Sequence, residues 1–403
     1  MSIFNSLGSN YNLRSVLDNL LAGNDEEYSQ RLKRYLGDMY GGQVTLTYKG
    51  REAIELALNI LDLPTDSYIA VTGYTCYAVY IAVKNAGCHI EYLDIDKKGI
   101  NFSAETLSLA INRNPKIKAV IVQNTLGYPC DIRNIESLCQ RQNIILIEDL
   151  AHSVGALYED GREAGTVGQF VALSFSQDKI IDSVSGGALI VRDRTYQDIH
   201  PRIFGRVNVQ QQRTDKFYPL LTFVIRGTYT FRLGKLLHHV CRRLKLLSSP
   251  MSGLDGQYLY RLPNRYARIV YKQFSLLDGE LKHRRAIARI YSKNLSSELI
   301  SAGVSASIEG ATNLRFPICV NNRDEIVHYL RGQGIHLSDI WYDAPVAPKK
   351  YMQAVDFKQD SCPNAVEMSR VMVNLPTHKN ISVWQAKLIA GIVNKWLTLQ
   401  QER

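Results

Sequence analysis

The sequence predicts an α/β fold with a mostly parallel, seven-stranded sheet between helices, followed by a smaller C-terminal α+β domain. Two observations predict this fold class. The first half of the 403-residue chain alternates short β-rich runs with helical patterns, an order typical of α/β domains. Several of these runs, such as residues 119–122 and 144–147, are apolar without alternation, which is expected of strands that helices bury on both faces.

Seven segments in the first half have the composition of strands, with helical patterns between them. The predicted strands are residues 43–48, 68–72, 89–93, 118–123, 143–148, 170–175 and 188–192. Residues 51–61 carry apolar side chains at helical spacing on one face, and residues 132–142 repeat this pattern. These segments belong to a predicted large domain, residues 1–255, which includes a basic insertion at about 198–256.

The rest of the chain, residues 256–403, is predicted to hold a linking helix and the small C-terminal domain. A long charged helix is expected near residues 266–295. After it come a strand at 314–319, a helix near 323–333, an extended run at 371–375 and a final helix at 383–397. This order of mixed elements predicts the α+β character of the second domain.

Composition narrows the class of protein. Hydrophobic residues make up 45% of the chain and charged residues 21%, which is ordinary for a soluble globular protein. The N-terminus lacks a basic region followed by an apolar one, so no signal peptide is expected, and we predict a cytoplasmic protein. The seven cysteines are scattered without a CxxC pair, so neither a disulfide framework nor a metal site is expected.

The net charge of +10 is concentrated in one segment. Ten basic residues and one acidic residue, Asp215, lie between Arg202 and Lys245. Three interpretations stay open: a solvated helical insertion, an amphipathic element on the inner, anionic face of the membrane, and a set of charges that holds a substrate diphosphate. The pair His238-His239 has no acidic or cysteine neighbours, which favours a solvated helix face. Nucleic acid is not an expected partner, because no recognised binding motif is present.

Polar side chains follow three of the predicted strands. Asp149 follows strand 143–148, Ser174 lies near the end of strand 170–175, and Lys179 lies just beyond it. Strand 43–48 runs into Gly50 and Arg51, where a helix begins and could accept a phosphate on its free N–H groups. In open α/β sheets ligands bind beyond the carboxyl ends of the strands. An amine, a carboxylate, a hydroxyl and a phosphate cradle are the groups that pyridoxal phosphate (PLP) requires.

A series of motifs also resembles a known family. They are residues 50–58, 73–76, 87–96, 127–131, 147–156, 174–179 with 185–187, 362–365 and 374–378. The series is similar to that of the DegT/DnrJ/StrS family, which are PLP-dependent nucleotide-sugar aminotransferases of fold type I (aspartate aminotransferase-like). The lysine loop at 174–179 and the run Leu375-Pro376-Thr377-His378 are the most specific motifs.

The resemblance implies a role for each candidate residue. Lys179 is the catalytic residue, which binds the cofactor covalently and moves the proton between carbon atoms. Asp149 pairs with the ring nitrogen, and His152 faces the ring oxygen in place of the glutamine more common in the family. Gly50, Arg51 and Ser174 bind the phosphate. A residue at Cys76 or Tyr77 is expected to stack on the ring.

The resemblance also implies the reaction. The enzyme is expected to transfer an amino group, with glutamate as donor, to a keto-sugar nucleotide for surface polysaccharide, lipopolysaccharide or aminosugar synthesis. Type I enzymes build their sites at a dimer interface, so a homodimer is expected. One alternative is a pyridoxamine-dependent sugar dehydratase, in which a histidine replaces the lysine; Lys179 argues against it. Another is a non-catalytic binding or regulatory relative that acts through the basic insertion.

Overall fold

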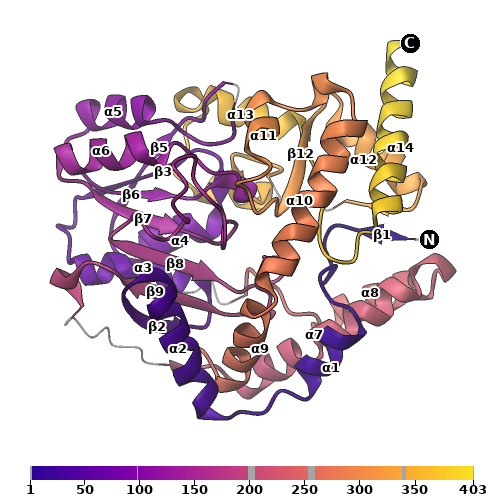
Figure 1. Ribbon diagram of the computed structural model, residues 1–403, viewed down its shortest axis with the longest axis horizontal. Helices are drawn as coiled ribbons and strands as arrows, with labels where there is room; N and C mark the ends of the chain where they lie inside the picture. Colours follow the sequence, from indigo (N-terminus) through magenta and orange to yellow (C-terminus); the bar gives the residue numbers. More distant parts are fainter. Residues whose placement is uncertain (1, 98, 198–204, 253–258, 338–341, 403) are drawn as a thin grey trace.

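The computed structural model describes residues 2–97, 99–197, 205–252, 259–337 and 342–402 (Figure 1). A large sheet with helices on both faces occupies one side of the molecule, and a smaller group of strands and helices the other. In the described ranges the α-helices are α1 (Leu13–Leu20), α2 (Glu26–Tyr40), α3 (Gly50–Leu61), α4 (Tyr77–Asn85), α5 (Ala104–Arg113), α6 (Ile132–Gln142), α7 (Val209–Gly227), α8 (Leu233–Arg243), α9 (Asn264–Phe274), α10 (Leu277–Asn294), α11 (Ala302–Ser307), α12 (Arg323–Gly332), α13 (Pro363–Val371) and α14 (Val383–Gln401).

All seven predicted strands form, and they are neighbours in one sheet. They are β2 (Gln43–Thr47), β3 (Tyr68–Thr72), β5 (His89–Leu93), β6 (Ile117–Val122), β7 (Ile145–Asp149), β8 (Phe170–Ser174) and β9 (Gly187–Val191), in the order β2-β9-β8-β7-β6-β3-β5. β9 is antiparallel to both its neighbours, and the other six strands share one direction. The predicted α/β fold class is confirmed.

Two strands that the sequence did not predict extend the β2 edge. They are β11 (Tyr260–Arg261), antiparallel to β2, and β10 (Gly205–Arg206), parallel to β11. Each is two residues long, too short to carry a recognisable strand pattern. With them the sheet has nine strands in the described part of the chain.

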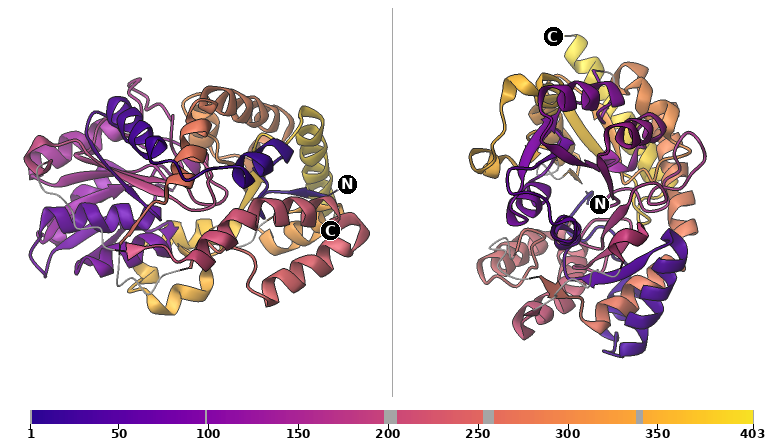
Figure 2. Two further views of the ribbon diagram at one scale, coloured as in Figure 1. Left: turned by 90° about the horizontal axis from the view of Figure 1, so that it is seen from below. Right: turned by 90° about the vertical axis from the view of Figure 1, so that its left-hand side faces the viewer.

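The alternation of side chains along the strands divides the core into two layers. Ile69 and Val71 of β3 face one layer with α3 and α4, whereas Ala70 faces the other with α2, α5, α6 and α9. The two faces of each strand are therefore both covered, which accounts for the continuous apolar runs in the sequence. The same layers are visible from two further directions in Figure 2.

The C-terminal part contains an antiparallel pair, β12 (Arg315–Cys319) and β15 (Met372–Pro376), against which α10, α12 and α14 pack. The N-terminus joins this part, because β1 (Ile3–Phe4) pairs in parallel with β13 (Ile335–His336). A second short pair, β14 (Val346–Ala347) with β4 (Thr75–Cys76), links the C-terminal part to the large sheet region. The division of the chain at residues 255 and 256 stays a prediction.

The expectation of one long helix near residues 266–295 is wrong. α9 ends at Phe274 and α10 begins at Leu277, with Leu276 outside helical geometry at φ −108° and ψ 0°. The break lets both Phe274 and Leu277 pack into the same buried core, while Leu276 between them is exposed.

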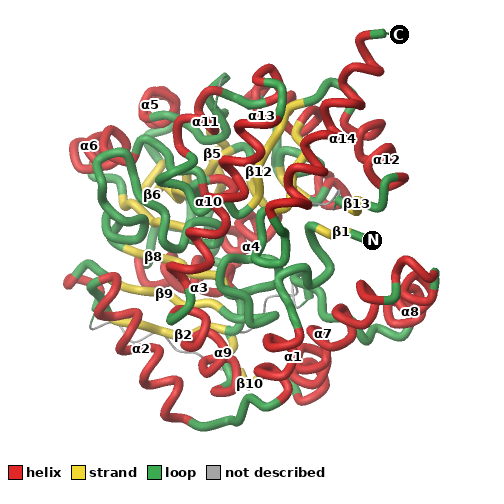
Figure 3. Tube along the Cα trace, turned by 45° about the vertical axis from the view of Figure 1, so that its right-hand side comes forward, coloured by secondary structure: helices red, strands yellow, loops and turns green. Residues whose placement is uncertain are grey.

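The described part of the basic insertion is a helical hairpin. α7 and α8 are joined by a 3-10 turn at Tyr229–Phe231. α7 packs on α1, and α8 lies at an edge of the molecule in all views (Figures 1–3). Residues 198–204 and 253–258, at the two ends of the predicted insertion, lie outside the described residues. None of the helices that the structure describes is both long and apolar enough to cross a membrane.

Candidate active site

The predicted site residues meet at the carboxyl ends of neighbouring strands. Asp149 is the last residue of β7 and Ser174 the last of β8, while Gly50 begins α3 shortly after β2. β9 runs between β2 and β8 in the opposite direction, so its first residues reach the same edge. Gly186 pairs there with Lys49. This is the edge at which open α/β sheets bind ligands.

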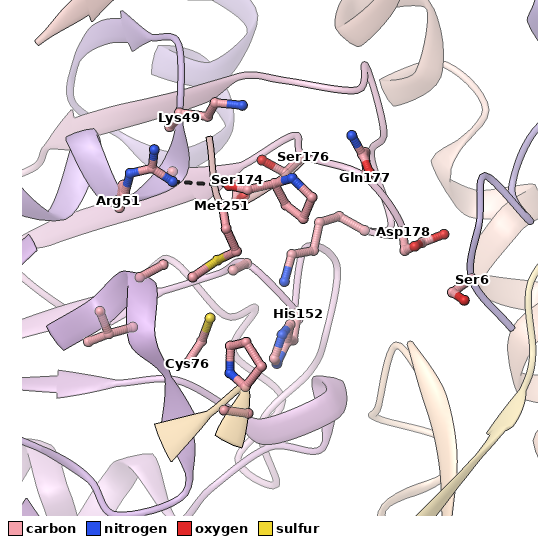
Figure 4. Close-up of a pocket in the computed structure, with 18 of the residues that line it drawn as sticks. Ser6, Lys49, Arg51, Cys76, His152, Ser174, Ser176, Gln177, Asp178 and Met251 are labelled. Carbon is pink, nitrogen blue, oxygen red and sulfur yellow. Dashed lines mark hydrogen bonds between the residues drawn. The ribbon is translucent and has the colours of Figure 1, made fainter. Parts of the chain in front are cut away.

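All six predicted site residues line one cavity of about 570 Å³. They are Gly50, Arg51, Asp149, His152, Ser174 and Lys179. Figure 4 labels Arg51, His152 and Ser174 among the residues that line it. The fold therefore brings together predicted residues that lie up to 129 positions apart in the sequence. Among the described residues, no group of three His, Cys, Asp or Glu side chains is arranged to hold a metal ion.

The side-chain amine of Lys179 lies in the cavity and has a lowered pKa. Burial lowers the pKa of its amine to about 8, although the nearby Cys76 and Asp149 act in the opposite direction. A lysine that loses its proton near neutral pH can act as a nucleophile and as a base.

The loop that carries Lys179 is fixed by the buried carboxylate of Asp182, three residues after the lysine. The Asp182 carboxylate accepts hydrogen bonds from the backbone N–H of Asp178 at 2.8 Å and of Val184 at 3.0 Å. It also accepts from the Asn10 amide at 3.1 Å and from the Tyr11 hydroxyl. Asp178 adopts φ +62°, a left-handed conformation that these bonds stabilise. The N-terminal segment thus helps to position the lysine.

Asp149 is a buried carboxylate with an elevated pKa. Burial raises its pKa to about 6, while the N–H of Ala151, 2.9 Å from Oδ1, and the charge of Lys179 lower it. A cationic group next to this carboxylate would restore its ionised form. An ionised carboxylate in this place can form an ion pair with a protonated ring nitrogen.

His152 is a neutral imidazole of defined tautomer. Burial lowers its pKa well below the ordinary value. The backbone N–H of Leu126 donates to Nδ1 at 3.2 Å, so Nε2 carries the ring proton. His152 and Tyr342 also meet edge-to-face, with ring centroids 6.1 Å apart.

Gly50 and Ser174 form a tight cradle at the start of α3. A Cβ atom at Gly50 would lie 2.5 Å from the Cβ and 2.8 Å from the Oγ of Ser174. The carboxylate of Glu52 accepts the N–H of Tyr48 at 3.0 Å and of Lys49 at 3.3 Å. These contacts position the N-terminus of α3 next to the cavity, where its free N–H groups favour an anion.

Two basic residues flank this cradle. Arg51 donates to the backbone carbonyls of Pro250, at 3.1 Å, and of Ser252, so it also ties the segment after α8 to the cavity (Figure 4). Lys49, which the sequence analysis did not single out, is buried and donates from Nζ to the Ser185 hydroxyl at 2.9 Å. Burial lowers its pKa to about 8.

The opposite wall includes residues that the sequence analysis missed. The Thr75 hydroxyl donates to the side-chain oxygen Oε1 of Gln123 at 2.6 Å, and the side-chain Nε2 of Gln123 donates to the Tyr342 hydroxyl at 2.9 Å. No local motif marks Gln123 or Tyr342, because the contact joins positions 219 residues apart. Of the two ring-stacking candidates, Cys76 lines the cavity, whereas the ring of Tyr77 stacks on Tyr351 at 4.2 Å.

The rim of the cavity is formed partly by the basic insertion. His238 and Arg242, one turn apart on α8, line it together with Tyr218 of α7 and Met251. His238 is half-buried at this rim, whereas His239 is exposed, as the interpretation of a solvated helix face expected for the pair. α8 therefore turns one side, with His238 and Arg242, toward the cavity.

Comparison with known proteins decides the family. The model of the DegT/DnrJ/EryC1/StrS aminotransferase family matches residues 12–394. The chain belongs to this family. Like other members it is a PLP-dependent aminotransferase.

Individual relatives are distant in sequence but similar over nearly the whole chain. The GDP-perosamine synthase of Escherichia coli O157:H7 is 24% identical over 388 residues, covering 95% of this chain and 94% of its own. The dTDP-3-amino-3,6-dideoxy-alpha-D-galactopyranose transaminase of Aneurinibacillus thermoaerophilus is 22% identical, covering 94% and 91%. The structure of Spr1654 from Streptococcus pneumoniae in its PLP form superimposes with a TM-score of 0.70 at 18% identity, covering 95% and 96%.

The residues of this aminotransferase fit PLP. The cavity offers a buried carboxylate whose elevated pKa a cationic ring nitrogen would offset, and an amine of depressed pKa. The cradle at Gly50 has no room for a side chain on the glycine, as expected where backbone approaches a phosphate. Fold type I is confirmed by the structural match.

Proposed function

We propose that this aminotransferase transfers the amino group of glutamate to the ketone of a nucleotide-linked sugar, in the synthesis of surface polysaccharide, lipopolysaccharide or an aminosugar. The observation that carries the proposal is the shared cavity of Lys179 and Asp149, with a cationic rim. The relatives named above act, by their names, on nucleotide-linked sugars. The lysine loop at 174–179 and the run Leu375-Pro376-Thr377-His378 support the same substrate class.

When bound, PLP supplies an aldehyde that carries the amino group and a ring that withdraws electrons from the reacting carbon. Lys179 would hold it covalently and then move a proton with its Nζ atom, which the low pKa allows near neutral pH. Asp149 would keep the proton on the ring nitrogen. Gly50, Ser174 and the first turn of α3 would bind the phosphate, and the Nε2–H of His152 would donate to the ring oxygen.

The rim of the cavity suggests how the sugar nucleotide is held. Arg242 presents a guanidinium that can bind a diphosphate through two hydrogen bonds, and His238 lies one turn before it. Holding the diphosphate at the rim would place the attached sugar toward Lys179 and orient its ketone. Of the three interpretations of the basic insertion, this is the one in which its charges hold a substrate diphosphate, here on the side of α8 that faces the cavity.

We further propose a homodimer with the site near the interface, because type I enzymes are built in this way. A dehydratase reaction is disfavoured by Lys179, which that reaction class replaces by histidine. A purely regulatory protein would not require a lowered pKa of Lys179 next to a raised pKa of Asp149.

The test is a two-step assay with purified, PLP-loaded protein. Glutamate should bleach the visible absorption band of the bound cofactor, and a keto-sugar nucleotide from a panel should restore it with formation of an amino sugar. Lys179→Ala protein and keto-sugars without a nucleotide serve as controls. The proposal fails if glutamate leaves the band unchanged, or if no nucleotide-linked ketone restores it.

A further inference from the structure

The outer side of α8 presents an apolar stripe to solvent. Leu233, Leu236, Val240 and Leu244 are 51%, 60%, 40% and 61% exposed. They are separated by three, four and four residues, so they lie along one side of the helix. His238 and Arg242, which line the cavity, lie on the other side. We call the four exposed residues the α8 stripe.

The segment that carries the α8 stripe is rich in basic residues. Arg243 lies beside the α8 stripe, and Arg232 and Lys245 flank the two ends of α8. Lys235 lies seven residues before Arg242 and therefore on the same side of the helix as Arg242. Asp215, the sole acidic residue between positions 202 and 245, is buried. Its Oδ2 accepts hydrogen bonds from the hydroxyls of Tyr48 at 2.5 Å and Tyr266 at 2.9 Å. It is therefore turned inward and does not neutralise the exposed basic residues.

We infer that α8 docks on an anionic lipid bilayer through the α8 stripe, with its basic residues at the headgroups. A helix with an apolar side flanked by Lys and Arg lies in the membrane interface in this way, and both forces contribute to binding. Long basic side chains extend toward the phosphates while their methylene groups cover the apolar edge. In the single chain α8 lies at an edge of the molecule (Figures 1 and 3), and the side chains of the α8 stripe are exposed there.

Charge selects this occupant over a second copy of the chain. Two α8 stripes brought together by a two-fold axis would also bring the same basic residues together, whereas a bilayer with anionic headgroups offers the opposite charge. Docking would leave the cavity side of α8 facing the protein. Membrane binding and substrate binding would then use different sides of one helix, so they can be tested separately.

The experiment is flotation of the PLP-loaded protein with vesicles, without substrate. Vesicles of phosphatidylcholine alone are compared with vesicles of roughly one part phosphatidylglycerol to two parts phosphatidylcholine. The protein should float with the anionic vesicles only, and about 0.5 M NaCl should weaken its binding. The variant Leu236→Ser/Val240→Ser should reduce the partition coefficient by about tenfold or more. Leu109→Ser, at an equally exposed leucine on α5, is the matched control and should bind like wild type.

The inference is overturned if the wild-type protein does not float with anionic vesicles, or if the double variant floats as well as wild type. It is also overturned if the double variant dissociates into monomers in sedimentation velocity, since the α8 stripe would then be a subunit interface. Amino transfer from glutamate in vesicle-free solution is measured in parallel. Its failure would contradict the proposed function without bearing on flotation.

Discussion

Two ionisable residues in the cavity are shifted by burial toward their neutral forms, and in opposite directions along the pH scale. The pKa of Asp149 is raised to about 6 and that of Lys179 is lowered to about 8. Each partly offsets the burial of the other through its charge. The cofactor-free protein therefore holds groups that reduce its own stability, an arrangement typical of functional sites.

Asp149→Asn should stabilise the cofactor-free protein at neutral pH while impairing catalysis. The folded pKa of about 6 exceeds the unfolded value of roughly 3.9, so wild-type stability falls as the pH rises from about 4 to about 6. The variant lacks this loss and should be more stable at pH 7 by up to about 3 kcal/mol, with no difference below about pH 4. Amino transfer should drop by about 100-fold or more. Urea unfolding across pH measures the first effect, and turnover the second.

Asp66→Asn is the control for this comparison, because Asp66 is exposed and pairs with Lys116 at 2.9 Å on the surface. It should change both quantities little. A variant at position 149 that is no more stable than wild type at neutral pH, yet fully active, would contradict the account of Asp149.

Gly50→Ala should weaken PLP binding, because the added methyl group would collide with Ser174. We expect a loss of about tenfold or more in cofactor affinity, together with destabilisation by about 1–3 kcal/mol. Equilibrium titration with PLP, followed by absorbance, measures the affinity. Gly279→Ala is the matched control, since no atom lies within 4 Å of the corresponding position in α10. It should leave the affinity unchanged and stabilise the helix by up to about 1 kcal/mol.

At the scale of the element, α8 shows how the basic insertion contributes residues to the active-site cavity. Its inner side reaches the cavity, so the basic residues there are available to a substrate. Arg242 lines the rim, and Arg243 lies beside the α8 stripe. These adjacent residues provide a matched pair for mutation.

Arg242→Gln should raise KM for the sugar nucleotide by about tenfold while leaving the reaction with glutamate unchanged, because a charged hydrogen bond to a diphosphate contributes on the order of 1.5–3 kcal/mol. Arg243→Gln should leave KM unchanged in vesicle-free assays. Steady-state kinetics with each substrate varied in turn separates the two half-reactions. Equal effects of both substitutions would indicate a long-range charge effect and contradict a rim contact of Arg242.

The elements also show what sequence could and could not predict. The seven long strands were predictable because burial on both faces leaves continuous apolar runs. The break between α9 and α10 was not, because neither Ser275 nor Leu276 is a strong helix breaker and the break depends on packing of Phe274 and Leu277. Asp149, Ser174 and Lys179 were found because strand ends converge. Lys49, Gln123 and Tyr342 were missed because their place in the cavity depends on contacts between distant segments.

At the scale of the whole molecule, a buried arginine connects the C-terminal part to the N-terminal segment. Arg284 of α10 is fully buried and bonds to Glu280 at 2.8 Å. It also donates to the Leu314 carbonyl and the Thr377 hydroxyl, both at 3.1 Å, and to Asn10 at 3.3 Å. Asn10 in turn donates to the carbonyl of Lys179 at 3.0 Å. One residue thus links α10, β12, the Leu-Pro-Thr-His motif and the lysine loop.

Arg284→Met should destabilise the protein by about 3 kcal/mol, because it removes the guanidinium that donates to the Glu280 carboxylate and to the side-chain oxygen of Asn10 in a buried network. Denaturant unfolding of the PLP-loaded protein measures this. Arg289→Met is the control, since Arg289 pairs with Glu309 on the surface and should contribute less than about 1 kcal/mol. Equal losses from both substitutions would show that the buried network has no special part in stability.

The whole account depends on which lysine binds the cofactor, and the cavity contains two with a pKa of about 8, Lys49 and Lys179. Lys179 is the one whose amine interacts with Asp149. Borohydride reduction of the PLP-loaded protein, followed by peptide mass mapping, distinguishes them directly. We predict that the reduced cofactor is attached to Lys179. Attachment to Lys49, or to no lysine of the cavity, would contradict the assignment.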